Sequence, residues 1–246
     1  MIDIHCHILP EVDDGPKSWD AAVEMCRMAA TDGIRHIVAT PHANDRYVYD
    51  RSHLASLLGQ LREKLDPALT LQFSLGCDFH LSFENLERAL EHPHTYTIGD
   101  TNYLLVELSN YSVPAQLSEC FTRLGDRGLT PILTHPERNP ILQETPQRIL
   151  EWAEQGCLIQ VTGSALTGQW GERPEAIARW LLDRSAVHVL ASDAHDTKRR
   201  VPNLSAARQA AEKIAGAEYA EALVEGNPGA IIAGMPIPYC PRPVLR

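Results

Sequence analysis

The sequence has no apolar run that approaches the roughly 18 residues needed to cross a bilayer, so we expect no transmembrane segment. Its first seven residues contain neither a basic nor an apolar stretch, so we expect no signal peptide and a cytoplasmic protein. Positive charge is scarce as well, because 22 Lys and Arg face 32 Asp and Glu and leave a formal net charge of −10. An acidic surface repels a phosphate backbone, and we therefore expect no nucleic-acid partner.

Close cysteine pairs are also absent. Six cysteines are scattered along the chain and none forms a Cys-x-x-Cys motif, so we expect reduced thiols. The glycine motifs of nucleotide-binding proteins and the G-x-S-x-G elbow of serine hydrolases do not occur. Cys240 and Arg246 match the spacing of cysteine phosphatases, but Pro241 and Pro243 remove backbone N–H donors that such a loop needs. We interpret this match as accidental.

The chain does contain a regular alternation of short apolar runs and amphipathic stretches. The apolar runs predict strands at residues 1–5, 36–40, 69–75, 103–108, 130–134, 157–161 and 187–191. The amphipathic stretches predict helices at residues 18–30, 53–64, 81–91, 114–127, 146–155, 174–184 and 205–215. Seven such units indicate an α/β fold, either a β/α barrel or a doubly wound open sheet. We expect one domain over residues 1–235 and a proline-rich, non-helical tail over residues 236–246.

Histidine and carboxylate side chains follow the predicted strands in a consistent way. In barrels and open α/β sheets, active sites gather at the carboxyl ends of the strands. Nine potential metal ligands lie at or just after the ends of six predicted strands: His5, His7, Asp14, His42, Asp78, Glu107, His135, Asp193 and His195. His92 and His94 lie between a helix and a strand, at the opposite end of the fold, and are expected at the surface. Histidines inside predicted strands or helices are expected to be structural: His36, His53 and His188.

The spacing of the ligands favours a metal cluster. His5 and His7, like Asp193 and His195, are two residues apart and point to the same side of an extended backbone. Asp3 shares that side with His5 and is expected to accept an N–H of a ligating histidine. A mixture of imidazoles and carboxylates suits Zn, Mn or Fe. Nine ligands exceed the needs of one ion, so we expect two or three.

Arginines stand among these ligands. Arg138 comes three residues after His135, and Arg199 and Arg200 follow His195 closely. A guanidinium group binds phosphate through two parallel hydrogen bonds and stabilises charge that develops during phosphoryl transfer. The sequence therefore predicts a phosphate-binding site beside the metals.

Taken in order, these motifs resemble the polymerase and histidinol phosphatase (PHP) superfamily, and more closely its bacterial capsule-type protein tyrosine phosphatases (CpsB/YwqE-like). The resemblance covers residues 1–228 and is carried by MIDIHCHILPEVDDGPKS, Ala-Thr-Pro-His42, Gly-Cys-Asp78, Val-Glu107-Leu-Ser, Thr-His135-Pro-Glu-Arg138 and Val-Leu-Ala-Ser-Asp193-Ala-His195. It implies a distorted (β/α)7 barrel with a metal cluster at the carboxyl ends of the strands. It also implies metal-dependent hydrolysis of a phosphotyrosine protein of exopolysaccharide or capsule regulation, with a bacterial tyrosine autokinase as the expected partner.

The resemblance further implies roles for individual residues. His5, His7 and Asp193 hold one ion, Glu107 and His135 a second, and Asp78 is shared by both; Asp14, His42 and His195 hold a third. The metals are Mn or Fe, with Zn as the alternative, and Arg138 and Arg200 bind phosphate. The chain departs from the family at Asp78, where the family has Glu. Alternative functions are a histidinol-phosphatase-like enzyme for small phosphate esters, a 3′–5′ exonuclease, and a non-catalytic metal-binding module.

Overall fold

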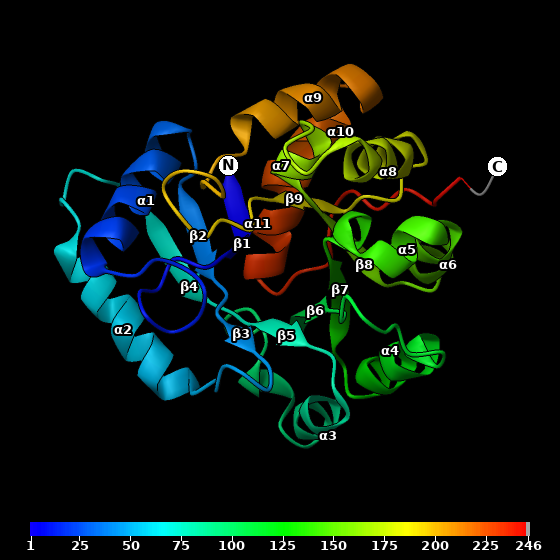
Figure 1. Cartoon of the computed structure of the whole chain (residues 1–246), viewed down its shortest axis with the longest axis horizontal. Helices are drawn as coiled ribbons and strands as arrows, with labels where there is room; N and C mark the ends of the chain where they lie inside the picture. Colours follow the sequence, from blue (N-terminus) through cyan, green and yellow to red (C-terminus); the bar gives the residue numbers. More distant parts are fainter. Residues whose placement is uncertain (245–246) are drawn as a thin grey trace.

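Seven parallel strand positions follow one another around the molecule in chain order. The computed structural model describes residues 1–244, and Figure 1 shows its strands at the centre with helices around them. The strands are β1 (Ile2–Cys6), β2 (His36–Ala39), β3 (His42–Ala43), β4 (Gln72–Leu75), β5 (Asp78–His80), β6 (Tyr103–Glu107), β7 (Thr130–Thr134), β8 (Leu158–Thr162) and β9 (Val189–Ala191). They form a three-stranded sheet ordered β1-β2-β4 and a six-stranded sheet ordered β3-β5-β6-β7-β8-β9.

Two strand positions are interrupted, so that β3 continues β2 and β5 continues β4. Pro41, between β2 and β3, has no N–H to donate to a neighbouring strand. Gly76, between β4 and β5, lies so close to β2 that a Cβ atom there would be 3.0 Å from Cγ1 of Val38. Gly76 N donates to Ala39 O at 2.8 Å and Asp78 N to Pro41 O at 3.2 Å, which carries the pairing across both breaks.

The ring of strands closes between β1 and the segment that follows β9. Cys6 and Ala194 form an isolated parallel bridge. The N–H of Asp193 donates to the carbonyl of His5, and that of His7 to the carbonyl of Ala194, both at 2.8 Å. Because consecutive strand positions are neighbours all the way round, the fold is a distorted (β/α)7 barrel, as predicted, and not a doubly wound sheet.

Seven longer helices match the predicted ones to within a few residues: α1 (Trp19–Thr31), α2 (Arg51–Lys64), α3 (Phe83–Glu91), α4 (Leu117–Asp126), α6 (Gln147–Glu154), α8 (Glu172–Asp183) and α9 (Ser205–Ala215). The hydroxyl of Ser18 caps α1 by accepting from Ala21 N at 3.2 Å. Four short helices were not predicted: α5 (Pro140–Glu144), α7 (Gly163–Leu166), α10 (Ala217–Glu221) and α11 (Asn227–Ile232). Within residues 1–244, no helix combines the length and the apolar character that crossing a membrane requires.

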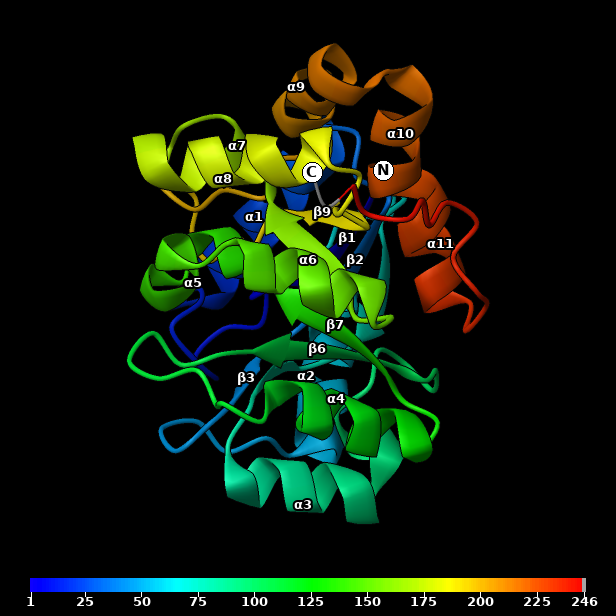
Figure 2. The same ribbon diagram turned by 90° about the vertical axis from the view of Figure 1, so that its right-hand side faces the viewer.

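The barrel interior is apolar at its amino-terminal end. Ile4, Leu105, Ile132 and Val189, from four different strands, are buried in one cluster with Ile231 of α11. Figure 2 shows α11 at the end of the barrel opposite to the arrowhead of β6. Since α11 closes this end with apolar side chains, polar groups can gather at the carboxyl ends of the strands.

Helix α9 takes its cap from a distant residue. The carboxylate of Asp32, which follows α1, accepts from the backbone N–H groups of Leu204 at 2.6 Å and Ser205 at 3.0 Å, and from the Ser205 hydroxyl. A carboxylate at a helix N-terminus satisfies free N–H groups and interacts favourably with the helix dipole. This contact joins the first helix of the chain to its last quarter.

The proline-rich tail forms no helix over residues 236–244 and lies along the surface. Val244 N donates to Arg184 O at 2.9 Å, and the ring of Tyr239 stacks on that of Tyr219 with centroids 5.0 Å apart. Residues 245–246, and with them the Arg246 of the Cys-x5-Arg spacing, lie outside the described part of the chain. All six cysteines lie within the described residues and are free.

We predict that buried His188 makes the stability of the fold depend on pH. Its Nδ1 accepts from Ile159 N at 3.0 Å, and burial lowers its pKa from 6.5 to about 4. Between these two values the unfolded chain binds the proton and the folded chain does not, so the free energy of unfolding falls as the pH falls. From about pH 7.5 to about pH 5 this loss amounts to about 2 kcal/mol.

His188→Asn, which keeps an acceptor but does not titrate, should lose this contribution. Urea denaturation of both metal-stripped proteins at each pH measures it. The stability advantage of the native protein over the variant should shrink by about 2 kcal/mol at the lower pH. A pH-independent difference between the two would contradict the assignment.

Candidate metal centre

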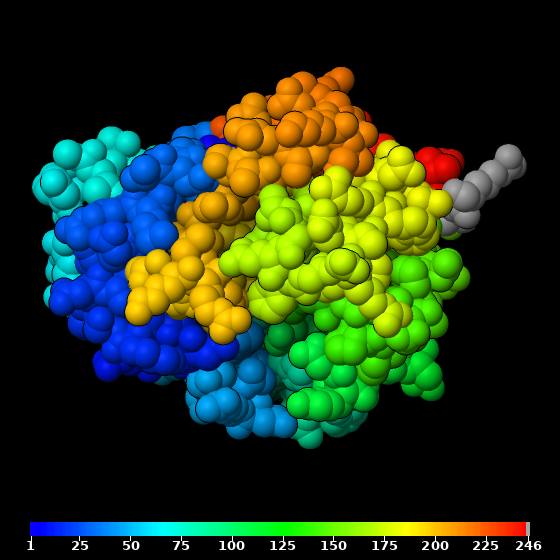
Figure 3. All heavy atoms as spheres, turned by 45° about the horizontal axis from the view of Figure 1, so that its top comes forward, coloured from blue at the N-terminus to red at the C-terminus, as the bar shows by residue number. Residues whose placement is uncertain are grey.

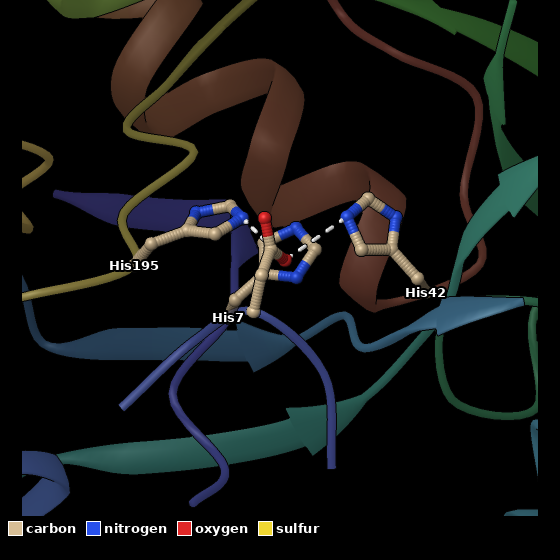
Figure 4. A group of neighbouring side chains, drawn as sticks. His7, His42 and His195 are labelled. Atoms are coloured by element: carbon tan, nitrogen blue, oxygen red, sulfur yellow. Dashed lines mark ion pairs between the residues drawn. The ribbon is translucent and has the colours of Figure 1, made fainter. Parts of the chain in front are cut away.

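Nine side chains meet at the carboxyl ends of the strands. They come from the end of β1 and the loop after it, from β3, β5 and β6, and from the segments after β7 and β9: His5, His7, Asp14, His42, Asp78, Glu107, His135, Asp193 and His195. Figure 4 shows the imidazoles of His7, His42 and His195 turned toward one another. The predicted set is therefore brought together in space, although its residues span most of the chain.

Two of these residues have an unusual backbone. His135, directly after β7, has a φ angle of 36°, and Asp193, after β9, has one of 51°. The left-handed region costs a residue other than glycine about 1–2 kcal/mol and is often occupied at functional sites. At both positions it bends the chain as the strand ends.

The potential ligand atoms fall into four overlapping groups, within each of which they lie no more than 4.8 Å apart. The groups are His5, His7 and Asp193; His5, Asp78 and His135; His42, Asp78 and Glu107; and His7, Asp14, His42 and His195. Asp78 belongs to two groups despite its short side chain. Glu107 lies closer to His42, at 3.6 Å, than to His135, at 3.9 Å.

The chemistry of this set fits bound cations. Asp78 is fully buried and neither of its carboxylate oxygens receives a hydrogen bond; His42 Nδ1 and His195 Nε2 are also buried without such a partner. Nε2 of His5 faces Nε2 of His7 at 3.3 Å. Buried polar atoms without partners are costly unless an ion satisfies them, and mixed imidazole and carboxylate donors suit Mn, Fe or Zn.

Electrostatics at the site points the same way. Burial lowers the pKa of His5, but the carboxylates of Asp78 and Asp193 outweigh it and raise this pKa to about 9. Burial and the neighbouring His195 lower the pKa of His7 to about 3. Burial is likewise outweighed at His42, where the carboxylates of Asp14 and Asp78 raise the pKa to about 11. Without metal, the carboxylates therefore attract protons onto His5 and His42, where cations would bind.

Two residues that orient the histidines were not predicted. Nδ1 of His7 lies 2.7 Å from Oδ2 of buried Asp13, and Nδ1 of His5 lies 3.0 Å from Oε1 of buried Gln160. Such partners fix the tautomer and the direction of a ligating imidazole. Asp13 stands next to the predicted Asp14, and Gln160 is a polar residue inside an apolar strand, so both left a weak signal in the sequence.

Asp3 has other partners in the structure than the imidazole that was expected. Its carboxylate accepts from the Ser192 N–H at 3.0 Å, the Ser192 hydroxyl at 2.5 Å and the backbone N–H of His5 at 3.4 Å, and not from an imidazole. Asp3 therefore joins β1 to the segment after β9. Its contribution is to the closure of the barrel.

The two arginines meet at one carboxylate oxygen. Arg138 Nη1 and Arg200 Nη2 both donate to Oδ2 of Asp193, the latter at 2.6 Å. The ring of Trp170, which was not predicted, lies beside them, with its centroid 3.7 Å from Cζ of Arg138 and 5.6 Å from Cζ of Arg200. Of the consecutive residues Arg199 and Arg200, Arg199 is exposed, and Arg200 is the one whose side chain reaches the site.

Other histidines and Cys6 lie apart from the cluster. His92 and His94 are exposed, as predicted. His53 is also exposed, on α2, although it was predicted to be structural. His36 Nε2 contacts Ser74 Oγ at 2.9 Å, and His188 is buried, as expected for structural residues. His80 lies at the edge of the site, 3.5 Å from Glu107. The Cys6 side chain is buried in an apolar cluster, and burial raises the pKa of its thiol, so it is no nucleophile.

Known proteins are similar to this chain in sequence and in fold. A family model described as capsular polysaccharide synthesis, CpsB/CapC, matches residues 1–233. Tyrosine-protein phosphatase YwqE of Bacillus subtilis (strain 168) is 34% identical over 227 residues, which cover 92% of this chain and 89% of that protein. Tyrosine-protein phosphatase CpsB of Streptococcus pneumoniae is 31% identical over 239 residues, 94% of this chain and 98% of that protein.

Solved structures are also similar to this chain. A crystal structure from the work on YwqE of B. subtilis and CpsB of S. pneumoniae, described as unique metal-dependent tyrosine phosphatases, matches over 100% of both chains. Its TM-score is 0.89, at 33% identity. Dihydropyrimidinase from Brevibacillus agri matches with a TM-score of 0.56 over 96% of this chain and 71% of that one. At 12% identity, this second likeness concerns the fold alone.

We predict that Asp13→Asn weakens metal binding about 10- to 100-fold, because the variant no longer fixes the His7 imidazole as a carboxylate does. Isothermal titration of the metal-stripped protein with Mn²⁺ measures the affinity. The control is Asp20→Asn, the same chemical change at an exposed position on α1. Equal affinities of the two variants would show that Asp13 does not support a metal ligand.

Proposed function

The chain belongs to the CpsB/CapC family, and we propose that it hydrolyses the phosphate ester of a phosphotyrosine protein that regulates capsule or exopolysaccharide synthesis. It is a metal-dependent tyrosine phosphatase. One observation carries this function: the guanidinium groups of Arg138 and Arg200 meet at a carboxylate that also faces His5 and His7, with Asp193 Oδ1 3.4 Å and 3.6 Å from their Nε2 atoms. Phosphate-binding groups and metal-binding groups thus lie side by side.

We propose that the nine side chains hold two to three metal ions. The assignment is His5, His7 and Asp193 for one ion, Asp78 shared with a second, Glu107 and His135 for that second, and Asp14, His42 and His195 for the third. Converging ligand atoms support the sets of the first and third ions, and Asp78 converges with His135 in one group and with Glu107 in another. Mn or Fe are the expected metals, with Zn as the alternative. Bound ions of this kind make water a nucleophile at neutral pH and withdraw charge from phosphoryl oxygens.

The protein's own groups position the ester for attack. Arg138 and Arg200 each donate one terminal N–H group to Asp193, so the other terminal nitrogen of each guanidinium group can bind the non-bridging oxygens of the phosphoryl group. Their charge stabilises the oxygens as the bond to the leaving group breaks. The leaving phenol has a pKa of about 10, so it leaves with less need for a proton than the alcohol of a serine ester.

The proposed physiological substrate is a bacterial tyrosine autokinase. The description of the family as one of capsular polysaccharide synthesis supports a substrate in that process. A histidinol-phosphatase-like activity on small phosphate esters is the main alternative, because the same metal site serves it. A net charge of −10 disfavours the 3′–5′ exonuclease.

Turnover of three substrates by one sample of known metal content tests the function. We expect a phosphotyrosine peptide to be hydrolysed faster than histidinol phosphate or single-stranded DNA, and activity to be lost with a chelator and restored with Mn²⁺ or Fe²⁺. A preference for histidinol phosphate would support the alternative. Full activity after removal of metal would overturn the proposal.

We predict that Arg138→Ala keeps its metal content but loses about 3–4 kcal/mol of transition-state stabilisation, a fall in kcat of about 10²–10³. Arg138→Lys should recover only part of this loss, because an ammonium group has no bidentate fork. Steady-state kinetics on a phosphotyrosine peptide, with metal counted in each variant, provides the measurement. A loss under about tenfold, with Lys as good as Arg, would instead identify a surface residue.

We predict that Trp170 acts through Arg138. Trp170→Ala should lower kcat about 5- to 30-fold, as expected for a cation–π contact of about 1–2 kcal/mol, and Trp170→Phe should keep most of the activity. In an Arg138→Ala background the same substitution should have a clearly smaller effect, because only the longer contact with Arg200, at 5.6 Å, remains. Equal effects in both backgrounds would mean that Trp170 contributes independently of Arg138.

A further inference from the structure

A pocket of about 320 Å³ lies beside Arg138 and Arg200, and three of its lining residues, Gln169, Asp196 and Arg199, have no role in the reaction described above. It is lined by Gln169, Trp170, Asp196, Arg199 and Arg200. Figure 3 shows the two segments that form it side by side, the yellow-green one near residue 170 and the yellow-orange one near residue 200. Trp170 and Arg200 belong both to this pocket and to the phosphate-binding site, so the two are adjacent.

The walls of the pocket are held in place. The side-chain amide of Gln169 donates to the carbonyl of Arg199, which ties the two segments together. The indole N–H of Trp170 donates to Ser164 Oγ at 2.9 Å. Oδ1 of Asp196 accepts from the backbone N–H groups of Lys198 and Arg199, both at 2.6 Å. The loop is therefore fixed by its own hydrogen bonds, and among the described residues the side chain of Arg199 has no hydrogen-bond partner.

The charge at the pocket differs from that of the molecule as a whole. The chain has a net charge of −10, but Lys198, Arg199 and Arg200 form an uninterrupted run of cations beside the pocket. The one carboxylate in the lining, that of Asp196, accepts from backbone N–H groups of its own loop. Arg200 is paired with Asp193, whereas within residues 1–244 neither Lys198 nor Arg199 forms an ion pair. Of these two unpaired cations, Arg199 lines the pocket and Lys198 does not.

We propose that this pocket binds an acidic residue of the substrate polypeptide close to the phosphotyrosine, through the guanidinium group of Arg199. The inference rests on the proposed function and narrows its substrate class to phosphotyrosines with acidic neighbours. Each residue of an extended peptide spans about 3.3–3.6 Å. With the phosphate on Arg200, a residue one or two positions from the phosphotyrosine can therefore reach the adjacent pocket that Arg199 lines. A guanidinium matches a carboxylate in shape and charge. Long-range repulsion by the acidic surface is screened over about 8 Å at physiological salt, so local cations decide the preference.

The experiment compares two phosphotyrosine peptides that differ only in having Asp or Asn on either side of the phosphotyrosine. The measured quantity is the ratio of their kcat/KM values in the metal-loaded full chain, because a ratio is independent of any change in overall activity. We expect the native protein to prefer the Asp peptide about fivefold, the range of a partly exposed ion pair. Arg199→Gln should bring the ratio close to one.

Lys198→Gln is the matched control, since it removes the same charge from the neighbouring residue, which does not line the pocket. It should keep the native ratio. Arg199→Glu should reverse the preference and favour a Lys-flanked peptide over the Asp peptide.

A native ratio of one, or equal losses of preference in Arg199→Gln and Lys198→Gln, would overturn the proposal. The second result would mean that the loop attracts acidic peptides only by its total charge. Failure of the proposed function is distinguishable, because then the native protein would hydrolyse neither peptide, whether or not it hydrolyses a small ester such as p-nitrophenyl phosphate.

Discussion

Asp193 joins three parts of the molecule. Its backbone N–H donates to the carbonyl of His5 and helps to close the barrel, while its buried carboxylate contacts imidazoles through Oδ1 and both arginines through Oδ2. Burial disfavours the charge of this carboxylate, yet Arg138 and Arg200 keep its pKa well below the usual range. One residue therefore takes part both in the backbone contact that closes the barrel and in the ion pairs of the site.

The crowding of carboxylates at this end of the barrel links metal binding to the stability of the fold. The carboxylates of Asp14, Asp78, Glu107 and Asp193 lie within one cluster, and burial together with the charge of Asp78 raises the pKa of Glu107. Protonated imidazoles relieve part of this repulsion, and cations relieve it more fully. A ligand that binds the folded chain alone stabilises it in proportion to its affinity, so loss of metal weakens the fold as well as the activity.

Much of this arrangement could be predicted, because in a parallel barrel the order of strands along the chain fixes which loops share an end. The nine ligand candidates were found from residue type and strand position alone. The breaks at Pro41 and Gly76 were missed, since an apolar run does not reveal where pairing stops. Gln160 and Trp170 were missed because their partners lie far away in the sequence. The contact of Asp3 with Ser192 was missed since it depends on how the ends of the barrel meet.

Closure of the barrel also determines when the site can form during synthesis. Asp3 and Ser192 are 189 positions apart, and Asp32 caps α9 from a comparable distance. Contacts of such long range form late in folding, and a chain emerges from the ribosome at about 5–20 residues per second. His5 and His7 are thus made many seconds before Asp193 and Arg200, and until then β1 has β2 on one side but lacks its neighbour on the other. The complete set of ligands is available only when the chain is nearly finished, so the metal centre is assembled late in synthesis.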